Sequence, residues 1–97
     1  MNSWLQQTHS RLYSELDSLQ TGHPSGRENG RWIAETQGKL DACTLLKDSP
    51  VEAQRIDIVR RTFDGKPHSD VDEQHIQHYR KGAIDFLESC SKMLADG

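Results

Sequence analysis

The spacing of apolar residues near the C-terminal end constrains the fold of this chain more than any other feature of its sequence. The residues in question are Ile76, Tyr79, Ala83, Phe86, Leu87, Cys90, Met93 and Leu94. They follow one another mainly at steps of three and four. In an α-helix this spacing places them all on one face, whereas in a strand it would divide them between the two faces. The stripe is wide, so we predict a long amphipathic helix over 71–95 that forms the central packing element of the fold.

Three earlier segments show narrower stripes with the same period. The first is predicted over 3–20, the second over 31–47 and the third over 50–63. Their apolar positions are Leu5, Leu12, Leu16 and Leu19; Ile33, Leu40, Cys43 and Leu46; and Val51, Ile56, Val59 and Phe63. Thr8 interrupts the first stripe, and Gly38 lies in the middle of the second, where a glycine often lets another backbone approach closely. No segment shows the period of a strand, so the sequence predicts an all-α, small antiparallel helical bundle of three to four amphipathic helices.

Glycine and proline separate the predicted helices. The segment 21–30, TGHPSGRENG, contains three Gly and one Pro and is predicted to be a loop, as is the shorter segment 64–70. Ser49, Pro50 and Glu52 have the spacing of a capping box, which predicts the start of the third helix. Ser69 or Asp70 is expected to cap the fourth helix. The whole chain, 1–97, is expected to form a single helical domain.

The composition suggests a thin core. Only 33% of the 97 residues are hydrophobic, and the net charge is −3. We therefore expect the apolar surface to be completed either by a second copy of the chain or by docking onto a larger protein. Cys43 and Cys90 both fall within apolar stripes and are expected to be buried thiols rather than a disulfide.

Several classes of function are not expected from this sequence. It has no apolar run long enough to span a membrane and no signal peptide, so we expect a cytoplasmic protein without a membrane partner. It shows no phosphate-binding loop, nucleophile elbow or cofactor motif, so neither an enzyme nor a bound cofactor is expected. The slightly acidic balance makes nucleic acid an unexpected partner.

Two alternative functions remain open. In the first, the segment 50–63 would enter a DNA groove and use Arg55, Arg60 and Arg61, although arginines near a helix C-terminus also favour the helix dipole. In the second, His75 and His78 would share a metal site, or the cysteines would carry redox chemistry. The two histidines lie three apart on the predicted helix, but a zinc site needs further ligands that the sequence does not supply.

The remaining candidates concern protein partners. Trp4 and Trp32 begin their helices, and Trp and Arg are enriched at binding hot spots, so Trp4, Trp32, Arg55, Arg60 and Arg61 are candidate contacts. Pro67 lies in a predicted exposed loop, where a cis–trans equilibrium is a feature that a prolyl isomerase recognises.

The sequence therefore predicts a small non-enzymatic protein-binding module. In size, helical character and lack of motifs it is similar in type to small phage-encoded proteins that inhibit or modulate host nucleases or defence complexes. This likeness of type, which implies a host–virus interaction, involves no specific residues.

Overall fold

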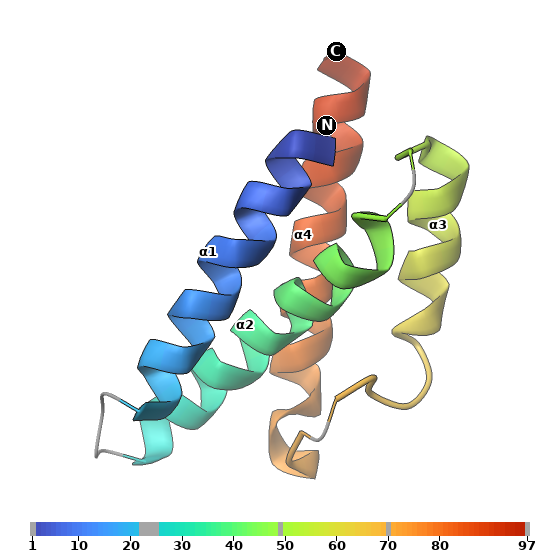
Figure 1. Ribbon diagram of the computed structural model, residues 1–97. Helices are drawn as coiled ribbons and strands as arrows, with labels where there is room; N and C mark the ends of the chain where they lie inside the picture. The colour runs from blue at the N-terminus through green and yellow to red at the C-terminus, as the bar shows by residue number, and fades with distance from the viewer. Residues whose placement is uncertain (1, 22–25, 49, 70, 97) are drawn as a thin grey trace.

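Four α-helices and one short 3-10 helix make up the computed structural model, which describes residues 2–21, 26–48, 50–69 and 71–96. The elements are α1 (Asn2–Thr21), α2 (Gly26–Leu46), α3 (Ala53–Thr62), η1 (Glu73–His75) and α4 (Ile76–Asp96) (Figure 1). No strand occurs in these ranges. The predicted all-α helical bundle is confirmed.

Helix α2 begins at Gly26, so the predicted loop over 21–30 was too long. Residues 22–25 lie outside the described part of the chain. Gly30 lies so close to His75 of η1 that a Cβ atom added to it would be 2.8 Å from the imidazole Nε2. We attribute the early start of α2 to such tertiary packing, which routinely overrides the low helix propensity of glycine.

Helix α3 begins at Ala53, three residues later than the predicted range 50–63. Glu52 is its N-cap residue, with extended backbone angles of φ −127° and ψ 154°, and its side chain makes no capping hydrogen bond. Ser49 of the predicted capping box lies outside the described residues. Val51 is half-buried against the core. Packing of this side chain explains why the segment before Glu52 stays out of the helix.

The fourth predicted helix is divided at its start. Residues 73–75 form η1, in which the His75 amide donates to the Asp72 carbonyl at 2.8 Å, and the α-helix proper begins at Ile76 rather than at residue 71. Ser69 does not cap this helix, because its hydroxyl donates to the Asp41 carboxylate of α2 at 2.7 Å. Asp70 lies outside the described ranges.

The closest contact in the fold is the crossing of α2 and α4. A Cβ atom added to Gly38 would lie 2.0 Å from the Tyr79 carbonyl oxygen, and one added to Gly82 would lie 2.1 Å from that of Glu35. Each glycine therefore lets the other helix approach its backbone, as expected for Gly38. Helices adjacent in the sequence run antiparallel, whereas α2 and α4 run in the same general direction (Figure 1).

The core follows α2, which packs against both α1 and α4. The largest fully buried side chains of the core come from α1, α2, α4 and the residue that follows α3. They are Leu5, Cys43, Leu46, Phe63, Tyr79, Leu87 and Cys90. Thr8 is also buried, so the polar gap expected in the stripe of α1 is part of the core. Both thiols are free and buried, as the apolar stripes predicted.

Candidate protein-binding groove

On the side of α2 that carries Asp41, the connection between α3 and α4 packs against the bundle. The Asp41 carboxylate accepts hydrogen bonds from Gln37 Nε2 at 2.8 Å, from Ser69 Oγ at 2.7 Å and from the Tyr79 hydroxyl at 2.5 Å. The same Tyr79 oxygen accepts a hydrogen bond from the His68 amide at 3.1 Å. These hydrogen bonds hold the α3–α4 connection against α2 and α4, so that the connection covers this side of the bundle.

The network around Tyr79 is structural. Burial raises the pKa of the Tyr79 hydroxyl above its ordinary value, and the hydrogen bond to the charged Asp41 carboxylate adds to the rise. The hydroxyl therefore keeps its proton at neutral pH and acts as a fixed donor.

On another side of α2, α1 and α4 leave a groove with a volume of about 540 Å³. At one end the Trp4 ring stacks on Phe86, with the ring centroids 5.8 Å apart and an interplanar angle of 17°. The lining residues are Trp4, Thr8, Arg11, Leu12, Glu15, Lys39, Asp85, Phe86 and Ser89.

The groove continues along α1 into a second hollow of about 330 Å³, with which it shares Glu15 and Lys39. This hollow is lined in addition by Leu19, Trp32, Glu35 and Thr36. Trp32 is 56% exposed. We call the two hollows together the tryptophan groove, because Trp4 lines the first and Trp32 the second.

Charged residues of both signs line the tryptophan groove, and most of them form no ion pair with the residues that the structure describes. Arg11, Glu15 and Asp85 are exposed, and none of their charged groups pairs with any residue that the structure describes. Lys39 approaches Glu35 of its own helix at 4.0 Å, the outer limit of an ion pair. These groups are free to pair with an incoming surface.

The structure thus places Trp4 and Trp32, two residues proposed from the sequence, in two hollows that share Glu15 and Lys39. Sequence reasoning missed the charged residues between them. One signal was present: Trp4, Arg11 and Glu15 recur at steps of seven and four, beside the leucine stripe of α1.

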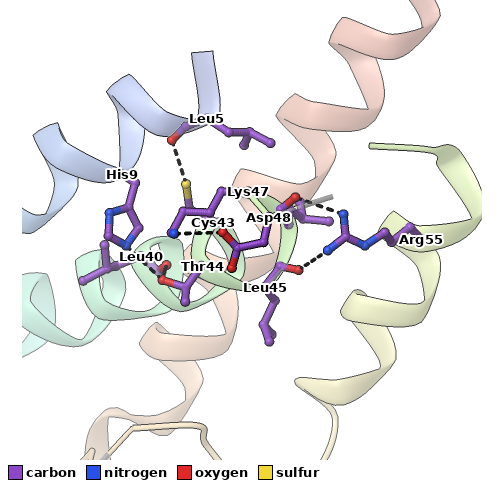
Figure 2. Close-up of polar contacts among 10 residues, drawn as sticks. Leu5, His9, Leu40, Cys43, Thr44, Leu45, Lys47, Asp48 and Arg55 are labelled. Carbon is purple, nitrogen blue, oxygen red and sulfur yellow. Dashed lines mark hydrogen bonds and ion pairs between the residues drawn. The ribbon is translucent and has the colours of Figure 1, made fainter. Parts of the chain in front are cut away.

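Arg55 lies elsewhere and caps α2. Its guanidinium donates to the Leu45 carbonyl at 2.7 Å and to the Leu46 carbonyl at 3.0 Å (Figure 2). These carbonyls belong to the last turn of α2, where carbonyls lack intrahelical partners. Figure 2 also shows Cys43 Sγ donating to the Leu5 carbonyl at 3.2 Å, which ties α2 to α1.

Arg60 and Arg61 lie on the exposed surface of α3, beside acidic residues. Arg60 pairs with Glu88 of α4 at 3.8 Å, and Arg61 pairs with Asp57 one turn earlier at 3.0 Å. Because carboxylates adjoin both guanidinium groups, this arrangement gives no support to phosphate contacts by α3.

Pro67 is half-buried in the α3–α4 connection, and neither it nor the arginines of α3 line the tryptophan groove. The described peptide bonds are all trans. The amide of the next residue, His68, is bound to Tyr79, so the loop is anchored directly behind the proline.

The candidate metal and redox groups are the two histidines and the two buried cysteines. The rings of His75 and His78 lie 6.1 Å apart, and no three His, Cys, Asp or Glu side chains converge to hold a metal in the described ranges. Burial raises the pKa of both Cys43 and Cys90 to about 11, so both thiols are protonated at neutral pH.

Comparisons with protein-family models, with curated proteins and with solved structures gave no match. In the described part of the chain, no helix combines the length and the apolar character needed to cross a bilayer.

Proposed function

We propose that this chain is a protein-binding module without catalytic activity, and that it engages a larger protein through the tryptophan groove. The observation that carries the proposal is the difference between the sides of α2. The Asp41 network and its loop cover one side, whereas the space between α1 and α4 stays open and is lined by aromatic rings.

The lining of the groove has the chemistry of a protein interface. Large aromatic side chains and arginine are enriched at such surfaces. Trp32 is exposed and Trp4 is half-buried against Phe86, and the unpaired charges of Arg11, Glu15 and Asp85 line the same groove. An apolar helix face or loop from a partner would cover both rings.

We propose a larger protein complex as the partner, such as a host nuclease or defence machine. The chain offers a binding surface, and its two thiols are buried and protonated. An effect on such a machine would therefore come from occupying one of its surfaces, which is the action of an inhibitor or modulator.

Affinity capture with matched variants tests the proposal. Trp32→Ser removes the exposed ring from the groove, whereas Tyr13→Ser removes a ring that is 63% exposed and lies outside the groove lining. Wild type and Tyr13→Ser are expected to capture the same partner in stoichiometric amounts. Trp32→Ser should bind it at least about tenfold more weakly, since hot-spot truncations exceed about 1.4 kcal/mol.

Two outcomes would contradict the proposal. One is the absence of any stoichiometric partner for the wild-type chain. The other is equal capture by wild type and Trp32→Ser, which would place the binding surface elsewhere.

A further inference from the structure

We infer that a second copy of this chain occupies the tryptophan groove, in a dimer with two-fold symmetry. The inference rests on the proposed function, because it requires the groove to be a binding surface, and it adds a second occupant that competes with the larger protein for that surface. Three observations carry it: the exposed area of the chain, the charges that line the groove and the position of the aromatic rings.

The chain exposes more surface than a folded monomer of its mass. Its accessible area is 6375 Å². Monomeric proteins of 11.1 kDa average about 5,700 Å² by the usual scaling with mass. A standard protein interface buries ~800 Å² per partner, so a second copy that covered such an area would bring the exposed surface of each chain near this average.

The charges of the groove complement one another. The larger hollow carries two basic residues, Arg11 and Lys39, and two acidic ones, Glu15 and Asp85. A groove of one sign would repel its own copy and would require a partner of the opposite sign. The second hollow adds Glu35, so the groove as a whole presents both signs of charge. A groove with both signs suits a two-fold interface, in which the same patch on both subunits must complement itself.

The positions of the charges on α1 allow such pairing. Arg11 and Glu15 are one helical turn apart and line the same groove. A two-fold axis that passes between them, perpendicular to α1, sets the two α1 helices antiparallel. Each Arg11 then lies beside Glu15 of the partner subunit, which forms the same ion pair twice.

The same axis also brings the exposed Trp32 of one copy opposite aromatic rings of the other copy. It reverses the groove, so that the Trp32 end of one copy faces the Trp4–Phe86 end of the other. Trp32, which is 56% exposed in the single chain, would then be covered by aromatic rings. Buried aromatic anchors contribute a large share of the binding energy of an interface.

The hollow between α3 and α4 is a weaker candidate for this contact. It has a similar volume of about 530 Å³ and is lined by Asp57, Arg60 and Glu88. Arg60 already pairs with Glu88, and Asp57 pairs with Arg61. A second copy would have to break these pairs, whereas the charges in the tryptophan groove are mostly free.

A charge-reversal experiment tests the dimer without assuming its exact register. One variant, Arg11→Glu with Lys39→Glu, makes the groove acidic; the other, Glu15→Lys with Asp85→Lys, makes it basic. The four side chains are exposed or half-buried, so both variants are expected to keep the wild-type helical circular dichroism. The oligomeric state of the full chain is measured by sedimentation equilibrium.

Wild type is expected to be dimeric and each variant alone monomeric, with dimerisation weakened at least tenfold by repulsion between like charges. An equimolar mixture of the two variants should dimerise again, because an acidic groove then faces a basic one. Trp32→Ser should also be monomeric, and the control Tyr13→Ser should remain dimeric.

A monomeric wild-type chain would overturn the inference, as would a dimer that both groove variants and Trp32→Ser leave intact. The experiments also distinguish failure of the dimer from failure of the proposed function. If wild type is monomeric but Trp32→Ser abolishes capture of a larger protein, only the dimer is wrong. If Trp32→Ser changes neither dimerisation nor capture, the groove is not a binding surface and both proposals fail.

Discussion

Single atoms decide how closely α2 and α4 can approach. At Gly38, an added methyl group would lie 2.0 Å from the Tyr79 carbonyl oxygen and 3.0 Å from the Ala83 amide nitrogen. Both neighbours are backbone atoms of a helix and cannot rotate away. We therefore expect Gly38→Ala to separate the helices and to lower the free energy of unfolding by about 2 kcal/mol or more, although alanine favours the helix by about 1 kcal/mol.

Gly65→Ala provides the matched control for this prediction. Nothing lies within 4 Å of a Cβ atom added at Gly65, and none of the described glycines has a positive φ angle. This variant should be as stable as wild type or more stable by up to about 1 kcal/mol. Urea unfolding of the two variants measures the difference, and equal stabilities would show that the crossing tolerates a methyl group.

The Tyr79 hydroxyl joins three parts of the chain. It donates to Asp41 and accepts from the His68 amide. Tyr79→Phe should cost about 1–3 kcal/mol, because it removes one donor from the carboxylate and leaves a partly buried amide without its partner. Tyr13→Phe removes a hydroxyl from an exposed ring and should change stability by less than about 0.5 kcal/mol.

The effect of Tyr79→Phe should be local as well as energetic. Hydrogen exchange of the His68 amide, measured by nuclear magnetic resonance, should become faster in Tyr79→Phe and stay unchanged in Tyr13→Phe. Unchanged protection of this amide would mean that the α3–α4 connection does not depend on the network.

At the scale of the helices, the sequence predicts which helices form better than it predicts the residues at which they begin. Apolar periodicity identified all four α-helices because each buries one face, and the burial of Cys43 and Phe86 follows from it. The starts of α2 and α3 were misplaced because tertiary contacts at Gly30 and Val51 outweigh local turn and capping signals. Sequence patterns carry no record of such contacts.

The groove was less predictable than the helices that form it. Trp4 and Trp32 could be proposed because they are large and begin the predicted helices. That they share a groove with Asp85 and Phe86 depends on how α1 and α4 flank α2, and that placement follows from the close crossing at Gly38 and Gly82. No periodicity within one helix encodes it.

The junction of α2 and α3 depends on one side chain. Arg55 donates to the Leu45 and Leu46 carbonyls of the last turn of α2. Arg55→Ala should lower the free energy of unfolding by about 1.5–3 kcal/mol, the usual contribution of hydrogen bonds to a charged group. Arg55→Lys should recover only part of this loss, because an ammonium group lacks the planar fork of donors.

Arg61→Ala is the control for Arg55. Its guanidinium pairs with Asp57 on an exposed helix surface, where such a pair contributes about 0.3–0.5 kcal/mol. Urea unfolding followed by circular dichroism compares the three variants. A loss for Arg55→Ala no larger than that for Arg61→Ala would show that the capping interaction contributes little to stability.

At the scale of the whole molecule, the order of the helices explains why the bundle is closed on one side only. Helix α3 and the connection that follows it return the chain to α4 along the side of α2 that carries Asp41. Besides α1 and α4, only Lys39 of α2 lines the hollow between these two helices in the described part of the chain. The open groove is therefore a consequence of topology rather than of one residue.

Alkaline pH should destabilise the whole fold through the buried thiols. Burial raises the pKa of Cys43 and Cys90 from 9.0 to about 11. Below pH 9 the thiols are protonated in both folded and unfolded chains, so their contribution to stability is fully present. Between pH 9 and about 11 the unfolded chain releases these protons more readily than the folded chain, so stability falls, by roughly 1–3 kcal/mol per thiol.

Tyr79 extends the loss to higher pH, because its raised pKa acts in the same direction above the ordinary tyrosine value of about 10. Urea unfolding at a series of pH values should therefore show stability declining from about pH 9. The double variant Cys43→Ala with Cys90→Ala should be less stable at neutral pH but should hold its stability until about pH 10, where Tyr79 begins to contribute. If wild type and the double variant decline in parallel from pH 9, the thiols are not the cause, and ionisation elsewhere on the chain must drive the alkaline transition.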